Sequence, residues 1–193
     1  MKRGRFFMER CAGINVILSG GWFCMKKITI ITAAGALVVI AALFFVFRND
    51  QLFLARQANA EIDAGGLKLM MTETDAKELL GEPEEFVQGF GGYMLEYPGK
   101  GISLTFLDDT DTDFYKKINQ IEITNPTYSI FKVRAGDDHK SAVESILSRG
   151  FSAKEGYTNY WKRNLFISLE QNGGKVSSIA IGISDKVAST RIY

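Results

Sequence analysis

The stretch Met70-Met71-Thr72-Glu73-Thr74-Asp75-Ala76-Lys77-Glu78-Leu79-Leu80-Gly81-Glu82-Pro83 decides the predicted fold of the second part of the chain. Thr72 followed three residues later by Asp75 is a variant of the capping box, which marks the beginning of a helix. Apolar residues then follow at helical spacing, and the Gly-x-Pro at 81–83 ends the helix. We therefore predict a short capped helix within this stretch.

A second segment repeats this order of elements. Asp137 or Asp138 caps a predicted helix that ends at Gly150. After each helix come four strand-like runs, at 85–90, 93–97, 102–107 and 118–124 in the first segment and at 152–155, 157–163, 165–170 and 176–183 in the second. The order of elements predicts an internal duplication, with one α+β repeat at 67–126 and another at 127–193.

Apolar and polar residues alternate within these runs, as in Ile102, Leu104 and Phe106 against Ser103 and Thr105. Such alternation indicates sheets with one packed face and one open face. The predicted fold class is α+β: an N-terminal transmembrane helix, then two tandem helix-plus-antiparallel-sheet repeats with the helices on one sheet face.

Residues 28–47 form an uncharged run of 20 residues, which as a helix would span about 30 Å, the thickness of a bilayer core. Lys26 and Lys27 precede it, so the positive-inside rule places the N-terminus in the cytoplasm. We predict a transmembrane anchor at 25–47, a juxtamembrane stalk at 48–66, and a single-pass protein of the cell membrane with its C-terminal domain outside. Cleavage near Ala58-Asn59-Ala60 is the alternative.

Residues 1–24 are interpreted as a non-native N-terminal extension or a cytoplasmic tail. Met25-Lys26-Lys27 already begins as an export signal does, with charge followed by an apolar run. Just upstream, Ser19-Gly20-Gly21-Trp22 requires purine-rich codons at the distance of a bacterial ribosome-binding site. Translation from Met25 is therefore a hypothesis, and the protein is taken as bacterial.

The charge and the cysteine content of the C-terminal part exclude several functional classes of protein. Residues 48–193 carry 17 Lys and Arg against 21 Asp and Glu, which is not the basic footprint of a nucleic-acid-binding domain. Both cysteines, Cys11 and Cys24, precede the apolar run, so the C-terminal part has no disulfide framework, thiolate nucleophile or cysteine zinc site. Its one histidine, His139, lies in the first turn of the second predicted helix, as a surface residue would.

The run Met71-Thr72 followed by Leu79-Leu80-Gly81-x-Pro83 resembles the motif of the small outer-membrane-assembly lipoproteins and of the tandem-repeat β-lactamase-inhibitory protein superfamily. The resemblance covers residues 67–193 in architecture and about 15 residues by motif. Met70 stands where that motif has Gly, and neither a lipidated Cys nor the inhibitor's disulfides are present. The resemblance implies a shape used to hold protein partners, without enzymatic activity.

The open sheet face carries the candidate binding residues. Aromatic residues and Met beside small residues make a surface that a protein partner can bury. The candidates are Met94, Thr105, Tyr160, Trp161, Phe166 and Ala180. Coverage of this face by residues 48–66, by the other repeat or by a second copy of the chain is the alternative.

Asp109, Asp111 and Asp113 have the spacing of the first three ligands of an EF-hand loop. However, Phe114 occupies the position of the required Gly, and Gln120 that of the bidentate Glu. We expect a solvated acidic loop that binds no cofactor, with a calcium site as the alternative.

Taken together, these features predict a membrane-anchored, extracytoplasmic, non-catalytic binding module for a protein or another envelope component. An inhibitor or immunity-type protein is the alternative within binding. A hydrolase based on carboxylates or a Ser/Lys pair is the alternative from another class, although no nucleophile–base pattern is present in the sequence.

Overall fold

The structure is a computed structural model that describes residues 39–40, 42–43, 50–89, 91–156 and 158–184. The chain divides into two units, residues 1–50 and 51–193, and only the second is described at length. Most of the apolar run at 28–47, and all of residues 1–24, lie outside the described residues. No helix among the described residues is both long and apolar enough to cross a membrane.

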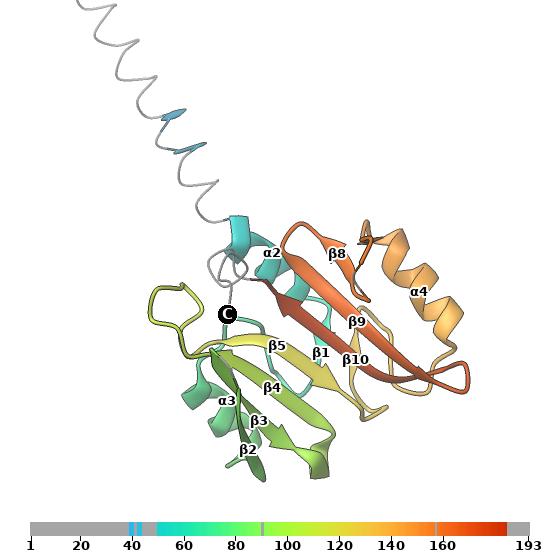
Figure 1. Ribbon diagram of the computed structural model, residues 1–193, viewed down its shortest axis with the longest axis horizontal. Coiled ribbons are helices and arrows are strands. Elements are labelled where there is room, and N and C mark those ends of the chain that lie inside the picture. The colour runs from blue at the N-terminus through green and yellow to red at the C-terminus, as the bar shows by residue number, and fades with distance from the viewer. Residues whose placement is uncertain (1–38, 41, 44–49, 90, 157, 185–193) are drawn as a thin grey trace, which may run out of the picture. The chain divides into compact units, whose positions relative to one another are not determined.

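One antiparallel sheet of eight strands dominates the second unit (Figure 1). Its spatial order is β2-β3-β4-β5-β10-β9-β8-β7. The strands are β2 (Glu85–Gly89), β3 (Gly92–Tyr97), β4 (Ile102–Leu107), β5 (Ile118–Ile123), β7 (Ser152–Ala153), β8 (Tyr160–Lys162), β9 (Leu165–Asn172) and β10 (Lys175–Ile183). The last strand of each half of the sequence, β5 and β10, pair at the centre of the sheet.

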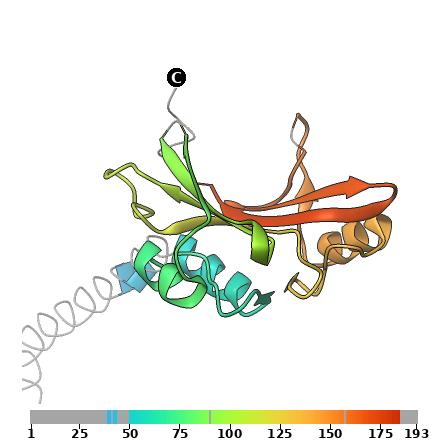
Figure 2. The ribbon, with the colours of Figure 1, turned by 90° about the horizontal axis from the view of Figure 1, so that it is seen from below.

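The second unit has three short α-helices, α2 (Asp50–Asn59), α3 (Glu73–Leu80) and α4 (His139–Ser148), and a 3-10 helix, η1 (Pro98–Lys100). Figure 2 shows all three α-helices on the same face of the sheet. The Thr72 side chain accepts a hydrogen bond from the backbone N of Asp75, so the predicted cap of α3 is confirmed. Asp138 caps α4 in the same way through the backbone N of Ser141.

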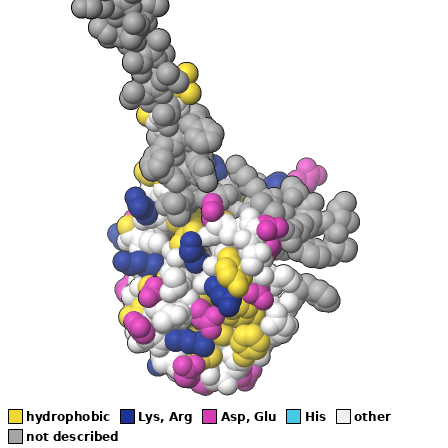
Figure 3. All heavy atoms as spheres, turned by 90° about the vertical axis from the view of Figure 1, so that its left-hand side faces the viewer, with side chains coloured by type: hydrophobic (Ala, Val, Ile, Leu, Met, Phe, Trp, Pro, Cys, Tyr) yellow, Lys and Arg dark blue, Asp and Glu magenta, His cyan; other side chains and the backbone are white. Residues whose placement is uncertain are grey.

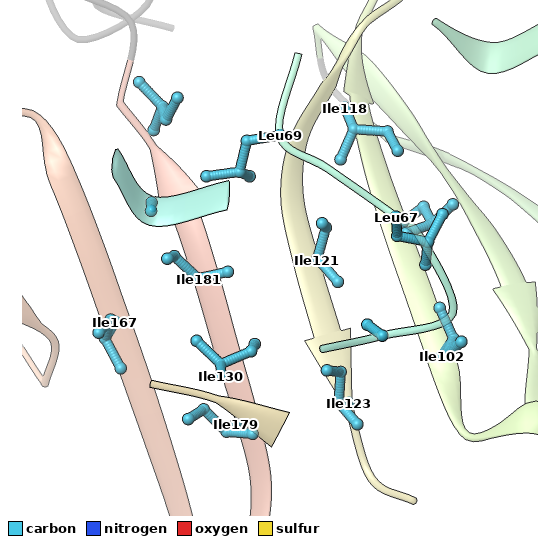
Figure 4. Packing of buried hydrophobic residues seen from close by; sticks show 14 of the residues in the cluster. Leu67, Leu69, Ile102, Ile118, Ile121, Ile123, Ile130, Ile167, Ile179 and Ile181 are labelled. Atoms are coloured by element: carbon cyan, nitrogen blue, oxygen red, sulfur yellow. The ribbon is translucent and has the colours of Figure 1, made fainter. Parts of the chain in front are cut away.

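Alternation along the strands sets the two faces of the sheet. In β4 the burial alternates residue by residue, with Ile102, Leu104 and Phe106 buried. Figure 4 shows Ile121, Ile123, Ile167, Ile179 and Ile181 from β5, β9 and β10 packed in one cluster with residues from outside the sheet. The inward-facing residues that alternation predicted are therefore buried, and a single core runs under both halves of the sheet.

Several residues of the segment 54–69 pack into this core. Ala58, Ala64, Leu67 and Leu69 are each 2% exposed or less. The Asn59 side chain bonds both backbone groups of Leu69, donating to its carbonyl at 3.0 Å and accepting from its N–H at 2.7 Å. Strand β1 (Ile62–Asp63) pairs with β6 (Ser129–Ile130), so the segment expected to form a stalk is tied to the middle of the chain.

The predicted fold class is wrong in its architecture. Instead of two tandem helix-plus-sheet repeats, the described residues of the second unit form one large antiparallel sheet with three short α-helices. The physical reason lies at β5 and β10, which would each be a free edge in a separate sheet. Pairing Ile123 with Ile179 and Ile121 with Ile181 satisfies both edges and joins the two apolar faces.

Candidate functional site: the open face of the sheet

The face of the sheet opposite the helices, here called the open face, carries one row of directly opposed residues across six strands. Each residue in the row is the register partner of the next. From β3 to β8 the row is Met94, Thr105, Gln120, Gly182, Phe166 and Trp161. At roughly 4.8 Å between strands, the row is about 24 Å long.

At the aromatic end of the row, the Phe166 ring occupies the space that a side chain at Gly182 would fill. A Cβ on Gly182 would lie 2.7 Å from Cε1 of Phe166, so the phenyl ring lies directly over the glycine. The Trp161 ring packs against Phe166 with a centroid distance of 5.3 Å and an interplanar angle of 44°. The ammonium of Lys154 lies 5.7 Å from the Trp161 ring centroid, a cation–π distance. This end is an aromatic platform with one positive charge.

The neighbouring row is polar and acidic. Its members, which are also register partners, are Glu96, Ser103, Glu122, Ala180 and Ser168. The Ser103 hydroxyl donates a hydrogen bond to the Glu96 carboxylate, and both acidic side chains of this row are partly buried. Ala180 is buried at 3% exposure. The open face therefore has carboxylates over β3 and β5 and aromatic rings over β8 and β9.

The register places five of the six predicted binding residues on the open face. Met94, Thr105, Trp161 and Phe166 share the first row, and Ala180 lies in the second. Tyr160 instead pairs with Ile167 and packs against the core on the helix side.

The sequence did not show which residues of β8 face the core and which lie on the open face. This strand has three residues and follows a polar loop, so no alternating run defines its face. Lys154 was missed as a neighbour of Trp161, and no sequence signal places it there because their contact depends on the hairpin of β7 and β8.

The acidic loop is organised by local hydrogen bonds. The backbone N of Asp111 donates to Oδ1 of Asp109 at 3.0 Å, and the Thr112 hydroxyl accepts from the backbone N of Phe114. Phe114 is fully buried, so the position of the EF-hand glycine is used as a core anchor. In the part of the chain that the structure describes, Asp109, Asp111 and Asp113 do not form a group of three that could hold a metal ion.

A second polar cluster lies on the helix side, where Tyr93 donates a 2.5 Å hydrogen bond to Glu73. Burial and this bond raise the pKa of Tyr93 well above its usual range. Burial acts to raise the pKa of Glu73, but the bonds from Tyr93 and Lys77 outweigh it, and the pKa is lowered. Lys77 lies 2.9 Å from Glu73, and its own pKa is raised by this hydrogen bond.

These shifts fix each group in its ordinary charge state at neutral pH. A general acid or base needs a pKa near the working pH. The shifted pKa values of Tyr93, Glu73 and Lys77 therefore suit a structural role better than proton transfer. It borders an open hollow of about 600 Å³ whose lining also includes Glu78, Glu82 and Tyr115. Figure 3 looks at the side of the molecule where α3 lies in Figure 1, and acidic and basic side chains are interleaved there.

No protein-family model matches the chain, and no curated protein matches it. A solved structure of an extracellular protein containing a SCP domain from Bacillus anthracis has a TM-score of 0.47 and 8% sequence identity to this chain. The match covers 65% of this chain and 47% of that one, so the chain spans less than half the length of that protein. The function of this chain is therefore inferred from its own site.

Proposed function

We propose that this protein is a non-catalytic binding module that holds a segment of a partner protein across the open face of its sheet. The observation that carries the proposal is the continuous row from Met94 to Trp161, whose members come from six strands on the face opposite the helices. Aromatic side chains supply large contact areas at little cost in conformational entropy and are enriched among residues that dominate binding energy.

The size of the row sets the kind of partner. A row about 24 Å long matches roughly seven residues of extended chain or a helix of about 16 residues. Two such rows of side chains cover a smaller area than the roughly 800 Å² that each side of a standard protein interface buries. The surface therefore suits one peptide-like segment of a partner.

The charges of the open face set the chemistry of that segment. Glu96 and Glu122 lie on β3 and β5 in one half of the sheet, whereas Phe166 and Trp161 lie on β9 and β8 in the other half. The complementary segment has Lys or Arg over the carboxylates and an apolar or aromatic side chain over the rings. The location of the C-terminal domain outside the cytoplasm stays a prediction from the sequence, because most of the apolar run at 28–47 lies outside the described residues.

A site-specific photo-crosslinking experiment tests the proposal in cells that produce the full chain. A photoreactive amino acid replaces Thr105 on the open face or Ser148, which lies at the exposed end of α4. We expect a discrete adduct from position 105 and none from position 148. The adduct should disappear with Phe166→Asp and persist with Leu147→Asp, a matched charge substitution at a residue of α4 that is 42% exposed.

Binding of the purified chain to the protein identified in that adduct then decides the proposal. Glu122→Lys should weaken binding to a basic segment roughly tenfold or more, and added salt should weaken wild-type binding. Equal adducts from positions 105 and 148, or unchanged affinity in both Phe166→Asp and Glu122→Lys, would overturn the proposal.

A further inference from the structure

A small pocket lies on the helix side of the sheet, away from the open face. Its volume is about 220 Å³, and it is formed where α2, the end of α4, the turn after β6, and strands β8 and β9 meet. Its apolar lining is Leu54, Ala58, Phe131, Phe151 and Leu165, and its polar lining is Gln57, Glu61, Arg149 and Lys162. The pocket therefore combines aromatic and aliphatic walls with two cations.

Both cations are held by neutral oxygen atoms. Arg149 donates from Nη1 to the carbonyl and hydroxyl of Ser145, at 2.9 and 2.7 Å. Lys162 donates from Nζ to the Arg149 carbonyl at 2.8 Å. Among the described residues, neither cation forms an ion pair with a carboxylate. Partly burying two cations that form no ion pair with a described carboxylate is costly. Among the described residues the hydrogen bonds of the Arg149 guanidinium use Nη1, which leaves Nε and Nη2 as donors toward a ligand.

Aromatic rings hold the same two cations in place. The guanidinium carbon of Arg149 lies 5.6 Å from the Phe131 ring centroid, and Nζ of Lys162 lies 5.8 Å from that of Phe151. The two rings meet edge to face with a centroid distance of 5.6 Å. Such packing orients the charged groups before any ligand arrives, which lowers the entropy cost of binding.

The wall formed by Phe131 is kept in a strained backbone. Ile130 and Val133 exchange two backbone hydrogen bonds of 3.0 Å around a two-residue turn. The residues of that turn, Phe131 and Lys132, have φ of 54° and 65°, where Asn and Gly are the usual residues. Bulky residues persist in the left-handed region only when surrounding structure enforces it, and such strain gathers at ligand sites.

We infer that this pocket binds a small monocarboxylate with an apolar or aromatic body. The carboxylate would meet Arg149 and Lys162, and the body would lie against Phe131 and Phe151. The volume has room for roughly seven to ten non-hydrogen atoms. Glu61 at the exposed rim leaves a net charge of +1 in the lining, which favours a monoanion over a dianion.

Titration of the full 193-residue chain with sodium benzoate, followed by the melting temperature and by NMR, tests this inference. We expect saturable binding that raises the melting temperature. Benzamide has the same shape without the charge, and inorganic phosphate has charge without the ring. Each should bind roughly tenfold more weakly or worse. Equal binding of benzoate and benzamide would overturn the inference.

Variants locate the site. Arg149→Met and Lys162→Met should each weaken benzoate binding roughly tenfold or more, with folding checked by melting without ligand. Gln57→Glu adds a negative charge to an exposed helical residue of the lining, so it should weaken binding without affecting folding. Lys132→Gln is the control and should keep wild-type affinity. Unchanged affinity in Gln57→Glu, or in a folded Arg149→Met variant, would contradict the assignment.

Discussion

Replacement of Gly182 by Ala tests the packing on which the open face depends. The new Cβ would lie 2.7 Å from Cε1 of Phe166 and 3.0 Å from the carbonyl oxygen of Asn119, so the ring must leave its place. Overpacking of this kind costs about 1–3 kcal/mol, and Ala regains about 0.5–1 kcal/mol over Gly within a strand. We expect a net loss of about 1 kcal/mol, a fall of roughly 2–4 °C in melting temperature for a chain of this size.

A double-mutant cycle with Phe166→Ala isolates the cause. Once the ring is absent, only the 3.0 Å approach to the Asn119 carbonyl remains, so Gly182→Ala should cost much less. The coupling between the two positions should therefore be about 1 kcal/mol or more in urea unfolding. Gly89→Ala in β2 is the matched control, because its Cβ would meet only the Gly92 carbonyl at an ordinary 3.6 Å. The reasoning is refuted if Gly182→Ala has the same effect with and without the Phe166 ring.

Four further predictions concern the helix side and the acidic loop. Tyr93→Phe removes the hydrogen bond to Glu73 and should cost about 1–2 kcal/mol in urea unfolding at neutral pH, where an unchanged midpoint would contradict the assigned role of this bond. Because folding lowers the pKa of Glu73, its contribution is present above the unfolded-state pKa. The cost of Glu73→Gln should therefore shrink between about pH 5 and pH 3. Thr72→Ala should cost about 1 kcal/mol through the lost cap of α3, whereas the exposed Thr74→Ala should cost little. Millimolar calcium should shift the melting temperatures of wild type and Asp111→Asn equally, and a shift in wild type alone would establish a calcium site.

Local signals in the sequence predicted the individual elements well. The cap and end of α3 were readable because a Thr hydroxyl and a glycine each satisfy a specific backbone need at the ends of a helix. The hairpin of β9 and β10 was readable from Gly173 and Gly174, whose φ angles of 59° and 78° suit a tight turn. The buried face of β4 followed from period-two alternation, whereas β10 is buried on both faces from Ser178 to Ile183.

Relations between distant segments were not readable. The pairing of β5 with β10 joins two strand edges. Nothing in the sequence of either strand distinguishes its edge from the edge of any other apolar strand. The two hydrogen bonds between the Asn59 side chain and the backbone of Leu69 join residues ten positions apart, and no sequence pattern marks them. Tyr160 was placed on the wrong face because β8 is too short to show its phase. The pocket of Arg149 and Lys162 was also not readable from the sequence, because its walls come from five separate elements.

The pairing of β5 with β10 also has a consequence for how the chain folds. Gln120 opposes Gly182 and Ile123 opposes Ile179, so the junction joins positions roughly sixty residues apart. Each half can form its own hairpins from neighbouring strands, but the junction must wait until both halves exist. During synthesis the emerging first half therefore presents β5 as an unpaired apolar edge, and the chain depends on its last strand to close it.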